Sequence, residues 1–138
     1  HDPDWMGDGW IGVFDNNTDG TESGTMLGGS RIVAIHTESD SVRTVFPTEK
    51  SAPFYTAGGG KWQRLANGNL LLTESRTGRI LEAAPDGHTV WEWTPPPYRE
   101  GKIAEVTEGT RYDLTKEQVA SWPCSRIGIR IDGRENLP

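Results

Sequence analysis

The chain has 138 residues, one cysteine, and 14 Lys and Arg against 20 Asp and Glu side chains, which gives a formal net charge of −6. This length suits a single domain, the lone cysteine excludes a framework of internal disulfides, and no apolar run reaches the ~20 residues of a membrane-spanning helix. Residues 1–40 contain eight acidic side chains and a single base, Arg31, and this balance disfavours a nucleic-acid partner.

Three short apolar segments in the first third of the chain predict β-strands, at residues 9–15, 30–35 and 40–45. A long loop, residues 16–29, separates the first two strands. The three segments match, in order and in character, three segments in the following part of the chain. We therefore interpret residues 5–47 as the first of two degenerate repeats.

The most regular part of the chain is residues 63–93, with the sequence QRLANGNLLLTESRTGRILEAAPDGHTVWEW. Turn sequences that contain glycine separate its three apolar runs, which lie at residues 69–74, 79–83 and 89–93. Strands about ten residues apart predict an antiparallel meander, which is the form of a propeller blade. Residues 62–95 are thus predicted to form the second repeat.

The last part of the chain, residues 99–138, is predicted to be an extension of this fold. Three consecutive prolines, at 95–97, cannot continue a central strand and end the second repeat. Residues 115–122 predict a short helix, because Thr115 and Gln118 have the spacing of a capping box. Residues 127–131 alternate as a last short strand. The predicted fold is all-β, with about two blades in residues 1–98 and one short C-terminal helix.

Two blades do not close a propeller, because each blade buries its faces only against neighbouring blades. We therefore expect other protein chains, either identical or different, to cover the open faces. The chain begins at His1 rather than at Met, which favours a fragment or a processed product.

The loop sequence Asp15-Asn-Asn-Thr-Asp-Gly20 fits the first half of a calcium-loop pattern, in which short oxygen-bearing side chains alternate. Asp15, Asn17 and Asp19 are the candidate ligands. The twelfth position of the pattern, where calcium loops carry Glu, is Met26, so an EF-hand is excluded. The alternative is a hairpin loop whose Asx side chains bind their own backbone.

Taken together, these segments resemble the arylsulfate sulfotransferase family. The resemblance rests on the ordered set LANGN, GRILE and DGHTVWEW in residues 65–93, and on HDPDWMGDGWIGVFDN followed by SRIVAI in residues 1–35. It covers about residues 1–98. The family's proteins are six-bladed propellers, and the resemblance is to their C-terminal part. It also implies a location in the periplasm or outside the cell.

The resemblance implies a site in which the His before the Phe-Asp-Asn strand is the nucleophile, and the matching residue here is His1. Its imidazole would take the sulfuryl group from an aryl sulfate and pass it to a phenol, with no cofactor required. Arg31 would bind the sulfuryl oxygens, and Asp2 would orient the His1 ring. The alternative function is a non-catalytic interaction or structural module that completes its fold with partner chains.

Overall fold

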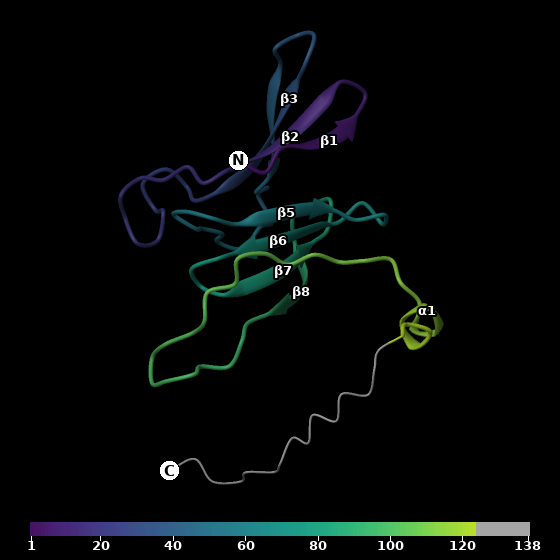
Figure 1. The fold of residues 1–138 in the computed structure, drawn as a ribbon. Helices are drawn as coiled ribbons and strands as arrows, with labels where there is room; N and C mark the ends of the chain where they lie inside the picture. Colours follow the sequence, from purple (N-terminus) through teal and green to yellow (C-terminus); the bar gives the residue numbers. More distant parts are fainter. Residues whose placement is uncertain (124–138) are drawn as a thin grey trace.

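The structure, a computed structural model, describes residues 1–123 and contains eight antiparallel strands in two four-stranded sheets with one short helix (Figure 1). The first sheet consists of β1 (Asp4–Gly7), β2 (Trp10–Asp15), β3 (Arg31–His36) and β4 (Val42–Phe46). The second consists of β5 (Lys61–Arg64), β6 (Leu70–Glu74), β7 (Arg79–Ala83) and β8 (Thr89–Trp93), and the helix is α1 (Lys116–Ala120). The predicted all-β fold with a short C-terminal helix is confirmed.

Each sheet is a meander in which consecutive strands are neighbours, in the orders β1-β2-β3-β4 and β5-β6-β7-β8. The tight turns need residues that accept positive φ, and Gly68 and Gly87 adopt φ values of 86° and 90°. Six of the strands coincide with predicted segments. β1 and β5 carry no strand pattern in the sequence, because they have only four residues each and lack an apolar run.

The core lies between the two sheets. Alternate side chains of a strand point to one face, and burial alternates in this way along β2 and β3, whereas every residue of β6 is buried. The core cluster consists of Phe14, Ile32, Phe46, Phe54, Trp62, Leu70, Leu72, Leu81 and Ala83. Phe54 comes from the segment between the sheets, and its ring centroid lies 5.8 Å from that of Phe14 and 5.5 Å from that of Phe46. One aromatic side chain of the connecting segment thus fills the space between the sheets.

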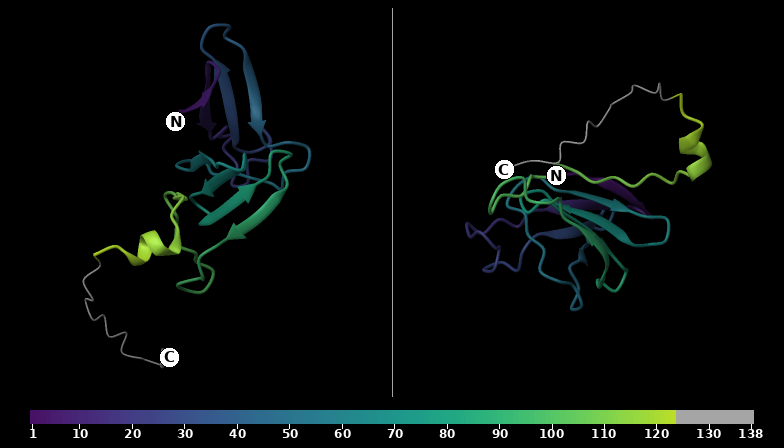
Figure 2. Two further views of the ribbon diagram at one scale, coloured as in Figure 1. Left: turned by 90° about the vertical axis from the view of Figure 1, so that its right-hand side faces the viewer. Right: turned by 90° about the horizontal axis from the view of Figure 1, so that it is seen from below.

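The chain itself covers part of the outer face of the second sheet. After β8 it returns across this sheet (Figures 1 and 2), where the Val106 N–H donates to the Ser75 carbonyl at 3.1 Å and the Gly109 N–H to Thr73 Oγ1 at 2.9 Å. A Cβ at position 109 would lie 2.8 Å from Ile80 Cδ1, so glycine permits this close approach. On this part of the second sheet the cover comes from the chain's own return segment, and the expectation that other chains cover the open faces stays a prediction.

The outer face of the first sheet has no such cover within residues 1–123. Ile35 and Val42 of this sheet are 40% and 63% exposed.

The capping box predicted at the start of the C-terminal helix is confirmed, since Thr115 and Gln118 form it at the start of α1. The strand predicted at residues 127–131 lies outside the described residues. No helix within residues 1–123 has the length and apolarity needed to cross a membrane.

Candidate functional site

His1 is fixed at the edge of the first sheet by Phe14 of β2. The His1 nitrogen donates to the Phe14 carbonyl at 3.0 Å, and the Phe14 N–H donates to the His1 carbonyl at 2.9 Å. The two rings are stacked, with centroids 5.0 Å apart and an interplanar angle of 25°. Within residues 1–123 the His1 ring nitrogens make no hydrogen bond, so backbone and ring are positioned while both nitrogens remain open to a ligand.

Asp2 connects this end of the first sheet to the second sheet. Its carboxylate accepts from the Trp62 N–H at 3.0 Å and lies 3.3 Å from Lys61 Nζ, and its carbonyl accepts from Trp62 Nε1 at 2.8 Å. These contacts differ from the predicted one, in which Asp2 orients the His1 ring. Sequence reasoning missed Lys61, whose only signal was a position directly after three glycines and before a tryptophan.

Arg31 lies on the other face of the first sheet from the His1 ring. Arg31 pairs with Asp15 in the register of β2 and β3, and its Nε donates to the Asp15 carboxylate at 2.8 Å. Phe14, which stacks on His1, is adjacent to Asp15 in the strand, and adjacent strand residues point to opposite faces. Within residues 1–123 Arg31 is thus bound to Asp15 and makes no hydrogen bond to His1, so a shared role of the two predicted catalytic residues stays a prediction.

The predicted calcium ligands contact protein groups. Asp19 accepts from the N–H and hydroxyl of Thr21 and from the N–H groups of Met26 and Leu27, which together lower its pKa to about 2. Asn17 donates from its side-chain amide to the Leu27 carbonyl at 2.8 Å. Burial raises the pKa of Asp15, but the hydrogen bonds from Arg31 and the Asn17 N–H outweigh it and lower the pKa overall.

Within residues 1–123 no three His, Cys, Asp or Glu side chains lie close enough together to hold a metal ion. The contacts of the loop thus favour the alternative interpretation, in which its side chains satisfy their own backbone. A calcium site at these residues stays a prediction that a melting experiment tests.

Asp19→Ala is expected to lower the Tm by a similar amount with calcium and with a chelator, because the substitution removes an acceptor for four protein donors. Differential scanning calorimetry in both buffers measures this effect, with Asp4→Ala as an exposed control. A calcium-dependent rise in the Tm of the native chain that Asp19→Ala abolishes would instead establish the calcium site.

The motif residues that carry the family resemblance form one network in the second sheet. The side-chain amides of Asn67 and Asn69 both donate to Glu82 Oε1, at 3.3 and 2.6 Å, and Arg111 Nη1 pairs with the other carboxylate oxygen. The Asn69 hydrogen bond is the main cause of a lowered pKa for Glu82, and it outweighs the opposing effect of burial. The LANGN and GRILE motifs are therefore linked through Glu82.

Comparison with known proteins gives one match, between residues 1–96 and the family model described as arylsulfotransferase (ASST). The matched residues include all eight strands and end shortly after β8. No curated protein and no solved structure matches the chain.

Proposed function

The chain belongs to the arylsulfotransferase family, and from this premise we propose that it transfers a sulfuryl group from an aryl sulfate to a phenol, with His1 as the nucleophile. Its two sheets would be two blades of a propeller, with repeats at residues 5–47 and 62–95. The observation that carries the proposal is the position of His1, whose ring is held against Phe14 while its nitrogens are free within residues 1–123.

The chemistry needs a positioned imidazole and a neutral nitrogen. This nitrogen attacks sulfur, the bond from sulfur to the aryl oxygen breaks, and the aryloxide leaves with the electron pair. In the second step the oxygen of the acceptor phenol attacks the same sulfur, the bond from nitrogen to sulfur breaks, and the phenol proton passes to solvent. The imidazole returns to its starting form, so the exchange needs no cofactor.

Lys61 and Arg31 differ in how well each is placed to bind the sulfuryl oxygens. Lys61 contacts Asp2, the residue next to His1, at 3.3 Å, and we propose it as the charge that opposes the developing negative oxygens. Arg31 pairs with Asp15 on the other face of the sheet. We propose that Arg31 holds β2 to β3 at the base of the long loop, in place of the sulfuryl-binding role that the resemblance implies.

The test is a search for a sulfated His1. The full chain is incubated with 4-nitrophenyl sulfate, and peptides are analysed by mass spectrometry under alkaline conditions, with release of 4-nitrophenol followed in parallel. We expect the mass of one sulfuryl group on the His1 peptide, and a loss of release of at least about 10³-fold in His1→Ala. His36→Ala is the matched control and should keep both signals. Unchanged turnover in His1→Ala would overturn the proposal.

A second candidate function is a non-catalytic interaction module that docks on partner chains. The exposed outer face of the first sheet, with Ile35 and Val42, favours it. Absence of both adduct and turnover, together with a multimer or hetero-complex in a solution mass measurement, would support this candidate. For either function we propose a location in the periplasm or outside the cell, which rests on the family alone.

A further inference from the structure

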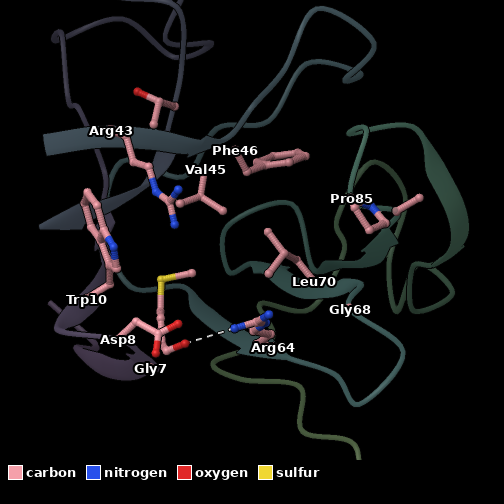
Figure 3. A pocket seen from close by; sticks show the side chains of 13 residues that line it. Gly7, Asp8, Trp10, Arg43, Val45, Phe46, Arg64, Gly68, Leu70 and Pro85 are labelled. Atoms are coloured by element: carbon pink, nitrogen blue, oxygen red, sulfur yellow. Dashed lines mark hydrogen bonds between the residues drawn. The ribbon is translucent and has the colours of Figure 1, made fainter. Parts of the chain in front are cut away.

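A cleft of about 640 Å³ opens between the two sheets (Figure 3). One wall is Trp10 of β2 and the facing part of β4, and the other is Arg64 of β5 with Leu70 of β6. Trp10 precedes Phe14 by four residues on the same strand, so it lies about 13 Å from the His1 end. The cleft is therefore separate from the site proposed for sulfuryl transfer.

Two arginines extend into this space from opposite sheets (Figure 3). The guanidinium carbon of Arg43 lies 4.3 Å from the ring centroid of Trp10, and Arg64 Nη1 donates to the Met6 carbonyl at 3.0 Å. Each guanidinium is thus held by one contact, and most of its N–H groups remain available for a ligand.

The charge of the cleft is positive in an otherwise acidic chain. Within residues 1–123 neither Arg43 nor Arg64 makes an ion pair with a carboxylate, whereas Arg79 and Arg111 do. Asp8 is the single acidic side chain that lines the cleft. Two arginines against one aspartate give the walls a net charge of 2 − 1 = +1 in a chain with a formal net charge of −6.

Apolar side chains lie at the floor of the cleft. Phe46 and Leu70 belong to the core and are 2% and 6% exposed, and Val45 packs against the same core. Guanidinium groups at the mouth and hydrocarbon below them are complementary to a molecule with an anionic head and an apolar body. The volume is within the ~300–1,000 Å³ of typical small-molecule sites.

We propose that this cleft binds a small amphiphilic organic anion, with its anionic group between Arg43 and Arg64 and its apolar body against Met6 and Val45, the half-buried side chains of the lining that pack on the core. The binding step involves no transfer chemistry and does not depend on His1. Arg43 stacks on Trp10 before the ligand arrives, which reduces the ordering that binding requires.

Naphthalene-2-sulfonate is the probe, because its sulfur is bonded to carbon and cannot serve as a sulfuryl donor. Isothermal titration calorimetry with the full chain and with His1→Ala should show a site that both share, and in either background Arg43→Gln and Arg64→Gln should each weaken binding at this site by about tenfold, the effect of one charged hydrogen bond. Asp8→Asn should strengthen it, because it removes the opposing charge. Arg99→Gln is the matched control on an exposed arginine outside the cleft.

Two further ligands test the two halves of the proposal. Naphthalene-2-sulfonamide, which is neutral, and inorganic sulfate, which has no apolar body, should both bind more weakly than the sulfonate. Melting curves establish that each variant is folded, and Arg43→Lys gives a second variant that keeps the charge without the planar fork. Equal binding of the sulfonate and sulfonamide, or unchanged binding in both Gln variants, would overturn the proposal. A missing His1 adduct beside intact sulfonate binding would overturn only the proposed function.

Discussion

Trp62→Ala is expected to lower the free energy of unfolding by about 3–5 kcal/mol, the usual cost of removing a large buried aromatic side chain. Trp62 is 3% exposed and belongs to the core between the sheets. Its ring lies directly over Gly12 of β2, where an added Cβ would come within 2.3 Å of it, and its Nε1 donates to the Asp2 carbonyl at 2.8 Å. The substitution thus removes packing and a hydrogen bond between the two sheets together.

Urea denaturation followed by circular dichroism measures the effect. Trp91→Ala is the matched control, because Trp91 is 45% exposed and should lose much less stability. Gly12→Ala changes the same contact on the side of the first sheet. It should also lower the free energy of unfolding, since its new methyl group would overlap the Trp62 ring. Equal losses in the Trp62 and Trp91 variants would contradict the view that Trp62 joins the sheets.

The sequence was most informative where one strand follows another through a short turn. The second repeat shows this, because its apolar runs and Gly-containing turns predicted β6, β7 and β8, and the structure has these strands. The strands β1 and β5 carry mixed and charged residues, and they form because tertiary contacts, such as Asp2 with Trp62, complete their environment. Such contacts join residues about sixty positions apart, and no local sequence pattern predicts them.

The candidate site could be predicted only in part for the same reason. The resemblance singled out His1, but its relation to Arg31 depends on the register of β2 and β3. Once Asp15 is paired with Arg31 and Phe14 with His1, strand alternation places the two side chains on opposite faces. The sequence also did not predict the return of the chain over the second sheet, because this return relies on single contacts such as that of Gly109 with Thr73.

Glu74→Ala is expected to be the other strongly destabilising substitution, with a loss of about 3–5 kcal/mol, as when one partner of a buried ion pair is removed. Glu74 ends β6 and is 4% exposed. Its carboxylate accepts from Arg79 Nε at 2.6 Å and from the Tyr55 N–H at 2.5 Å, while Arg79 also donates to the Pro53 carbonyl at 2.6 Å. The pair holds residues 53–55, and hence Phe54, in place between the sheets.

Glu92 supplies a control on the same arginine. Its carboxylate lies 3.7 Å from Arg79 Nη1, but its side chain is 59% exposed, so Glu92→Ala should cost no more than about 1 kcal/mol. Glu74→Gln should fall between the two, because the amide keeps the side-chain volume and one acceptor oxygen while losing the charge. Chemical denaturation of the three variants at neutral pH gives the order. If Glu92→Ala were as damaging as Glu74→Ala, the stabilising effect would come from the charge of Arg79 alone rather than from the buried contacts that hold Phe54.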